Sequence, residues 1–265
     1  MSRRARELIV LAVGLALVAG AALGGYAVVR ARAAGADGRQ SPAPVDLPAA
    51  ASPGAGSTPA PQYQRWTVGK AVGPVVVRVR PAPGAPVKAK LGKVNVNGYP
   101  TLVLVDTVRE VRGVVWYRVS VAMRPNGSRG WVREGQLAFY STSAKIVIDL
   151  SERELSVYRR GELRGTYPVA IGRPGLETPT GSFFINQKLK PASPGGAFGA
   201  LAIGISAFQP KLASWAQGGP VAIHGTNQDE LIGKAVSHGC VRMHDKDVLA
   251  VDRLVPAGSP VVITQ

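Results

Sequence analysis

Short runs of alternating apolar and polar residues occur along the chain from about residue 63 onward. Between residues 63 and 142 these runs are VVVRVR, TLVLVD, VWYRVSV and GWVREGQLAFY, and they are separated by Pro, Gly and Asn clusters such as RPAPGAP and RPNGSRG. A period of two is typical of half-buried strands, and turn clusters at this spacing are typical of small barrels and sandwiches. The pattern predicts a small β-barrel-like module over 63–142.

The alternation continues through residues 143–265 in KIVID, ELSVY, LRGTYPVAI and GSFFI, with RRGE as a predicted hairpin turn. DKDVLAVDRLV then changes to a helical period, which places Val248, Val251 and Val255 on one face and makes Asp245 the expected N-cap. PVVIT predicts a final strand. The fold class expected for 143–265 is therefore a mostly β domain with a late helix.

The N-terminal region has a different pattern. Residues 8–29 carry no charge and form an apolar run long enough to span a bilayer as a helix. A cleavable signal peptide is the alternative, because ARA ending at Ala33 resembles a cleavage site, but Arg30 and Arg32 crowd that site. We predict a cytoplasmic tail and uncleaved transmembrane anchor over residues 1–32.

Residues 33–62 are rich in Pro, Ala, Gly and Ser and show no hydrophobic periodicity, which predicts a linker between the anchor and the folded part. Lys and Arg outnumber Asp and Glu by 32 to 16 over the whole chain, for a formal charge of +16. Such a charge favours contact with nucleic acid, anionic lipid or an anionic cell-wall polymer. Nucleic acid is not expected as a partner, because aromatic residues make up only 6% and no stacking motif is visible.

The candidate chemistry centres on the only cysteine, Cys240, in AVSHGCVRM. A nucleophilic cysteine needs a base and donors for the oxyanion that forms. His224, at the end of the apolar run VAIH, is the candidate base. Gly239 and the backbone N–H groups around Cys240 are candidates for the oxyanion hole. No carboxylate stands out to orient the imidazole, and a backbone carbonyl would serve equally well.

Other readings of the same residues stay open on this pattern alone. A lone cysteine is usually a small buried apolar side chain. A zinc site of His224, His238, Cys240 and His244 is chemically conceivable, although the spacing fits no common structural pattern. Arg242 is either a solvated surface charge or an anchor for a substrate carboxylate. His244 is expected at the surface or beside the helix cap.

IHGT followed by SHGCVRM, together with TPTG at 178–181 and the strand pattern from KIVID to PVVIT, resembles the L,D-transpeptidase catalytic domain family. The resemblance implies that Cys240 is the nucleophile and His224 the general base, with its imidazole oriented by the carbonyl of Gly225. It places His238 near the substrate and the oxyanion region.

Three further residues are candidate substrate contacts: Ser237, Thr226 and Arg242. Arg242 stands where many members have Asn, and the interval from His224 to Ser237 is short for the family. Both features resemble one branch of the family and bear on substrate preference. No metal and no cofactor is expected.

The implied reaction is peptidoglycan cross-linking. The cysteine attacks the third residue of a tetrapeptide stem, expels the terminal D-alanine and passes the acyl group to an amine on a neighbouring stem. With water as acceptor the same site would be a carboxypeptidase, and with a protein amine it would attach proteins to the wall. A non-catalytic wall-binding protein is the remaining alternative. Because the substrate lies outside the membrane, this reading orients the N-terminus inside.

Within residues 63–142, WYRV, the PNG turn and GWV at 130–132 resemble a bacterial Src-homology-3-like module. Trp116 and Trp131 are expected to fill its core rather than contact a ligand, because buried aromatic side chains dominate small cores.

Overall fold

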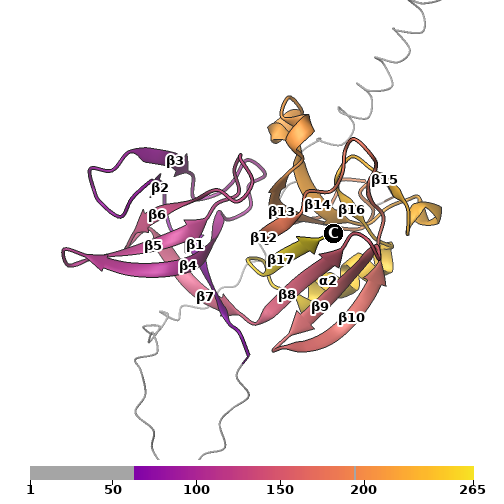
Figure 1. Ribbon diagram of the computed structural model, residues 1–265, viewed down its shortest axis with the longest axis horizontal. Helices are drawn as coiled ribbons and strands as arrows, with labels where there is room; N and C mark the ends of the chain where they lie inside the picture. The colour runs from indigo at the N-terminus through magenta and orange to yellow at the C-terminus, as the bar shows by residue number, and fades with distance from the viewer. Residues whose placement is uncertain (1–62, 194) are drawn as a thin grey trace, which may run out of the picture.

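The computed structural model describes residues 63–193 and 195–265 (Figure 1). The expected membrane anchor (1–32) and linker (33–62) lie outside the described residues. Within those two described ranges, no helix is long and apolar enough to cross a membrane. The described chain forms two mainly β parts, which we name the N-terminal module (63–142) and the C-terminal part (143–265). They are drawn in indigo to magenta and in pink to yellow in Figure 1.

The N-terminal module is one antiparallel sheet of seven strands, in the order β3-β2-β6-β5-β4-β1-β7. Alternate side chains of these strands, such as Val75 and Val77 in β2, are buried, as a period of two requires. Trp116 and Trp131 are both buried, so their expected core positions are confirmed. The strands are β1 (Trp66–Ala71), β2 (Val75–Arg78), β3 (Val87–Leu91), β4 (Leu102–Val111), β5 (Val114–Ser120), β6 (Arg129–Arg133) and β7 (Leu137–Thr142).

The C-terminal part is built on an eight-stranded mixed sheet in the order β10-β9-β8-β17-β12-β13-β14-β16, with a parallel pair formed by β11 and β15. The predicted mainly β class is thus confirmed. The strands are β8 (Ala144–Asp149), β9 (Glu154–Arg159), β10 (Glu162–Pro168), β11 (Ile171–Gly172), β12 (Gly181–Leu189), β13 (Ala202–Phe208), β14 (Pro220–His224), β15 (Ala235–Ser237), β16 (Val241–Arg242) and β17 (Pro260–Thr264).

Local sequence signals explain two features of this part. Arg160 and Gly161 join β9 to β10 with φ angles of 55° and 81°, so the RRGE hairpin turn is confirmed. The late helix is α2 (Asp245–Leu254), and Val248 and Val251 are buried in the main core as the helical period predicts.

The predicted N-cap of α2 is wrong. His244 occupies the N-cap position, and Asp245 is the first helical residue. The Asp245 Oδ1 instead accepts a hydrogen bond from the backbone N–H of Ala200 at 3.0 Å. Asp245 therefore ties the start of the helix to the segment before β13.

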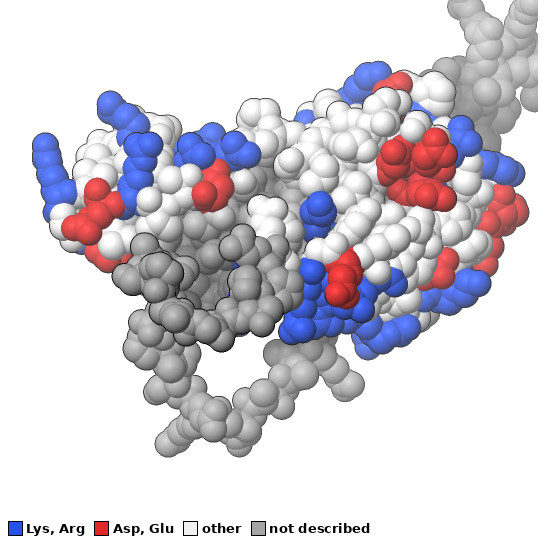
Figure 2. All heavy atoms as spheres, turned by 60° about the horizontal axis from the view of Figure 1, so that its bottom comes forward, with Lys and Arg blue, Asp and Glu red and all other residues white. Residues whose placement is uncertain are grey.

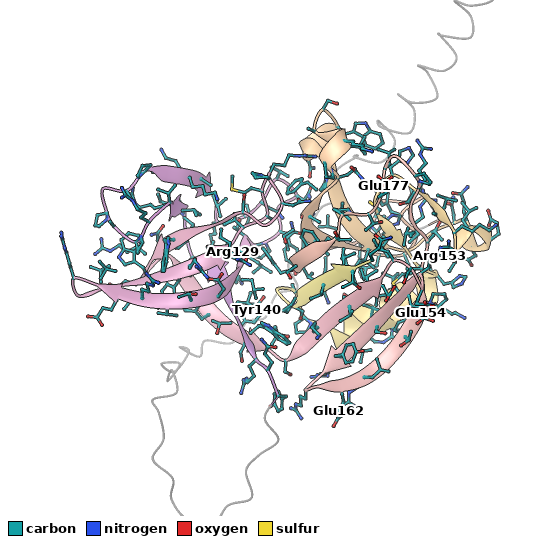
Figure 3. All side chains as sticks on the ribbon, in the orientation of Figure 1. Arg129, Tyr140, Arg153, Glu154, Glu162 and Glu177 are labelled. Carbon is teal, nitrogen blue, oxygen red and sulfur yellow. The ribbon has the colours of Figure 1, made fainter. Side chains whose placement is uncertain are left out.

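The two parts pack against each other through an apolar cluster of Val68 and Leu102 from the N-terminal module and Phe184 from β12. Beside it, the Tyr140 hydroxyl donates to the carbonyl of Ala257 at 2.9 Å, and Figure 3 shows Tyr140 at this junction. Burial raises the pKa of Tyr140 to about 12, so the phenol keeps its proton and the bond. The junction is a packed interface.

The surface carries the positive charge expected from the composition. Lys and Arg side chains are spread over both parts on the face shown in Figure 2, and Asp and Glu form smaller groups among them. Dispersed positive charge of this kind favours contact with an extended anionic polymer more than with one compact anion.

Candidate active site

His224 is placed by β14, the strand whose sequence is PVAIH. Val221 and Ile223 point into the main apolar core, so the alternate positions Ala222 and His224 lie on the opposite face of the strand. His224 is nevertheless only 3% exposed, and the ring of Phe198 lies over it with the two ring centroids 4.9 Å apart. The base candidate therefore sits in a shielded position at the end of a rigid strand.

Cys240 follows a tight turn after β15, and the Ser237 side chain closes that turn. The Ser237 hydroxyl donates to the Cys240 carbonyl at 2.6 Å and accepts from the Gly239 N–H at 3.0 Å. Gly239 has a φ of 113°, a conformation that residues with a Cβ rarely adopt. The glycine and the serine together fix the backbone on which the thiol is carried.

The register of β14 and β16 brings the cysteine and the histidine to one face. The strands are parallel, with Ile223 beside Val241 and His224 beside Arg242. Cys240 directly precedes β16, beside Ala222, so its side chain shares a face with that of His224. At normal strand spacing these diagonal neighbours have Cα atoms roughly 8 Å apart, a separation that the two side chains can bridge. Residues sixteen positions apart in the sequence thus become neighbours.

The imidazole of His224 is held in one tautomer. Its Nδ1 lies 2.6 Å from the Gly225 carbonyl oxygen, which can only accept, so the proton is on Nδ1 and Nε2 carries a free lone pair. The expected contact with Gly225 is therefore present. Gly225 itself packs tightly against Asp245, because a Cβ at this position would lie 2.0 Å from the Asp245 Oδ1.

The titration of the two groups follows from their surroundings. Burial lowers the pKa of His224 to about 4, with a smaller lowering from the Arg242 charge and an opposing effect of the Gly225 bond. Burial raises the pKa of the Cys240 thiol, against which the Ala222 N–H and Arg242 act. Near neutral pH the site therefore holds a neutral thiol beside a neutral imidazole.

His238 lies on the solvent side of the site. Its ring centroid is 5.4 Å from that of Trp215, which is half exposed. Burial lowers the pKa of His238, and the positive charges of Arg173 and Arg242 lower it further. Two guanidinium groups therefore stand close to the approach to Cys240, and they make it favourable for anions.

The three candidate substrate contacts differ in their surroundings. Ser237 and Thr226 are buried; the Ser237 hydroxyl closes the turn, and the Thr226 hydroxyl accepts from the Gln228 N–H at 3.1 Å. Arg242 donates from Nη1 to the Gln228 Oε1 at 3.2 Å, while its buried Nε has no hydrogen-bond partner. Of the three, Arg242 is the one whose side chain keeps an unpaired hydrogen-bond donor.

Several residues at the site carry no local sequence signal. Arg173, Trp215, Gln228 and Phe198 reach it from loops that are separated in sequence from the HGC segment. His244, the N-cap residue of α2, contacts the Asp229 Oδ1 through its Nδ1 at 3.0 Å. No group of three or more His, Cys, Asp or Glu side chains suited to a metal ion occurs in the part of the chain that the structure describes.

Comparison with known proteins places this site in a family. The model of the family described as "YkuD: L,D-transpeptidase catalytic domain" matches residues 143–263. YkuD of Bacillus subtilis is 36% identical over 126 residues, which cover 48% of this chain and 69% of that protein. The chain belongs to the L,D-transpeptidase family. This identification confirms the expected resemblance.

Two further proteins named as L,D-transpeptidases are similar to this chain. YkuD of Bacillus licheniformis is 41% identical over 120 residues, covering 45% of this chain and 65% of that protein. A solved L,D-transpeptidase of Mycobacterium tuberculosis H37Rv is 18% identical, with 61% of this chain and 98% of that chain covered and a TM-score of 0.41. The family assignment rests on the sequence relatives. The relation of residues 63–142 to Src-homology-3-like modules stays a prediction.

Proposed function

We propose that this chain is a membrane-anchored L,D-transpeptidase in which Cys240 is the nucleophile and His224 the general base. The observation that carries the proposal is the hydrogen bond between the His224 Nδ1 and the Gly225 carbonyl, 2.6 Å long. It leaves the lone pair of Nε2 on the face of β14 that Cys240 shares. A histidine that only filled the core would not need its second nitrogen free beside a thiol.

In the proposed acylation, the thiol proton moves to Nε2 of His224 as the sulfur attacks the carbonyl carbon of the third stem residue. The C–N bond to the terminal D-alanine then breaks, and the imidazolium returns the proton to the departing amine. The result is a thioester on Cys240. An amine of a second stem attacks the thioester, loses a proton to His224 and restores the thiol. The cycle needs no ATP, metal or cofactor.

The pKa directions support general-base attack. A raised thiol pKa and an imidazole pKa of about 4 disfavour a preformed thiolate–imidazolium pair, so the proton would transfer during attack. The low pKa also keeps His224 unprotonated, and able to act as a base, throughout the neutral range. This arrangement limits reaction of the resting thiol with small electrophiles.

Stabilisation of the oxyanion would come from backbone N–H groups. That of Gly239 already donates to the Ser237 hydroxyl, so we assign Gly239 to shaping the turn and the neighbouring N–H of Cys240 to the oxyanion hole. Nearby, Arg173 and Arg242 would attract the carboxylates of a stem peptide through their positive charge. His238 and Trp215 would line the approach.

The location of the enzyme follows from its substrate. Residues 8–29 would span the cytoplasmic membrane with the N-terminus inside, and residues 33–62 would link the anchor to the folded part outside. The formal charge of +16 fits a wall that carries carboxylates.

The test is incubation of the purified full chain with disaccharide-tetrapeptide fragments of peptidoglycan, followed by mass measurement of the products. A dimer lighter than two substrates by one D-alanine supports the transpeptidase. A tripeptide without dimer would make the protein a carboxypeptidase instead. Coupling only to an added protein amine would indicate wall attachment, and unchanged substrate would leave a binding protein. Cys240→Ala is the matched control.

A further inference from the structure

The loop between β13 and β14, residues 209–219, is held at both ends by an arginine of the N-terminal module. Arg124, in the connection between β5 and β6, donates from Nη2 to the Gln209 carbonyl at 2.5 Å and to the Gly218 carbonyl at 2.6 Å. Its Nε also donates to Gly218, at 3.0 Å. One planar guanidinium thus bridges the first residue of the loop and its next-to-last.

A second residue of the module secures the start of the same loop. The Asn126 amide donates to the Phe208 carbonyl and accepts from the Phe208 N–H, both at 2.8 Å. The Arg124 guanidinium also lies over the Phe208 ring, 5.6 Å from its centroid. Apart from this ring contact, every bond that Arg124 and Asn126 make to this segment is to its backbone, so these two residues fix where the main chain runs.

The loop in turn touches the residues that precede the nucleophile. Gln209 is 3% exposed, and its Nε2 donates to the Glu177 carbonyl at 2.6 Å; Figure 3 shows Glu177 at the end of the C-terminal part where this loop lies. A Cβ built on Gly239 would lie 3.0 Å from the same Nε2. Further along the loop, Trp215 lies beside His238.

We propose that Arg124, assisted by Asn126, is a positioning residue for the active site. It fixes the loop 209–219 so that Gln209 packs on Gly239 and Trp215 stands against His238, beside the approach to Cys240. The N-terminal module then belongs to the catalytic unit and is more than a spacer or a wall-binding attachment. The effect on turnover rests on the proposed function, but the effect on the loop does not.

The experiment compares Arg124→Gln with Arg109→Gln in the full chain. Arg109 is a matched control, because its guanidinium also lies 5.6 Å from an aromatic centroid, that of Trp131, but within the module. Hydrogen exchange of peptides covering 209–219 should be roughly tenfold faster in Arg124→Gln, since charge-assisted bonds to the loop are lost. Arg109→Gln should exchange like the unaltered protein.

Kinetics with the tetrapeptide donor separate positioning from general stability. We expect KM to rise several-fold in Arg124→Gln with a smaller change in kcat, because Trp215 beside the approach moves while the segments that carry Cys240 and His224 stay in place. If Arg124 acts through Trp215, then Arg124→Gln added to Trp215→Ala should raise KM little beyond Trp215→Ala alone. Fully additive effects would contradict the proposal.

Two further outcomes decide the matter. If Arg124→Gln unfolds, Asn126→Ala removes only the Phe208 bonds and should give the same local increase in exchange. Unchanged exchange of 209–219 in both variants, or an equal increase in Arg109→Gln, would overturn the positioning role. If the two variants differ in exchange as expected but the unaltered protein shows no turnover, the proposed function is overturned and the positioning role stands.

Discussion

The two β parts differ in what they bury. The N-terminal module buries the polar side chains of Ser128 and Thr142 and otherwise an apolar core. The C-terminal part buries a longer series of polar side chains, many with specific partners, which are Thr178, Gln187, Ser206, Gln209, His224, Thr226, Ser237 and Ser259. Burying a polar group is unfavourable unless it is paired. Gln187 and Ser259 bond side chains of the N-terminal module, whereas Gln209, His224 and Ser237 contact the segment that carries Cys240. This paired polar cluster distinguishes the candidate site from the surrounding scaffold.

The largest expected difference between the two parts is the loss of activity when the proposed nucleophile is replaced. Cys240→Ala should lower D-alanine release by on the order of 10⁴-fold or more, and His224→Ala by a comparable amount, because nucleophile and base act as a unit. The melting temperature of Cys240→Ala should stay close to that of the unaltered chain. D-alanine release unaffected by Cys240→Ala would refute the assignment, and a double variant far slower than either single one would refute the pairing.

The next largest effect concerns stability at low pH. The pKa of His224 is about 4 in the folded protein and 6.5 without burial, so only the unfolded chain takes up this proton as pH falls below 6.5. As pH falls from 6.5 to about 4, the free energy of unfolding should therefore drop by about 3 kcal/mol. Above pH 6.5, His224 should not change it. Urea unfolding of the protein and of His224→Gln checks this, since the variant should have a shallower acid slope; equal slopes would contradict it.

Replacing a glycine with positive φ should affect activity in the C-terminal part but not in the N-terminal module. Gly239→Ala places a Cβ at a backbone position with a φ of 113° and against Gln209. We expect the free energy of unfolding to fall by about 1–3 kcal/mol. Cys240 should also be displaced, so activity should fall about 10²-fold. Gly113→Ala, at a φ of 74° in the β4–β5 turn with open space around it, should lose stability alone. Donor turnover and melting curves of both variants test this, and equal turnover in the two would count against a shaped turn.

The smallest effects come from two buried serines. Ser237→Ala removes the partner of the Gly239 N–H and of the Cys240 carbonyl, so stability should fall by about 1–2 kcal/mol and turnover by roughly tenfold. Ser128→Ala removes a buried hydroxyl that has no partner and should be neutral or slightly stabilising. Paired measurements of turnover and unfolding decide the comparison, which fails if the two variants behave alike.

Local patterns in the sequence were sufficient to predict much of the fold and to single out two candidate site residues. Strand alternation, the Arg160–Gly161 turn and the helical period of Val248 and Val251 depend on near neighbours, and these predictions are confirmed. His224 and Cys240 stood out because histidine and cysteine are rare in this chain. These features depend on residues that lie close together in the sequence.

The remaining features depend on contacts between distant segments. Asp245 looked like a helix cap, but the backbone of Ala200, 45 residues away, uses its carboxylate. The bonds from Arg124 to the loop 209–219 span 85 to 94 residues, and nothing in the sequence around Arg124 marks it. Such contacts are set by how the sheets pack, which local propensity does not encode.

The position of β17 has a consequence for the order in which the large sheet can be completed. This strand comes last along the chain, yet it lies inside the large sheet, in parallel pairing with β8 and antiparallel pairing with β12. Until Pro260–Thr264 is available, the hairpins formed by β8 to β10 have no partner joining them to the strands that carry His224. A chain emerging N-terminus first can thus join the two halves of its large sheet only when its last strand is available.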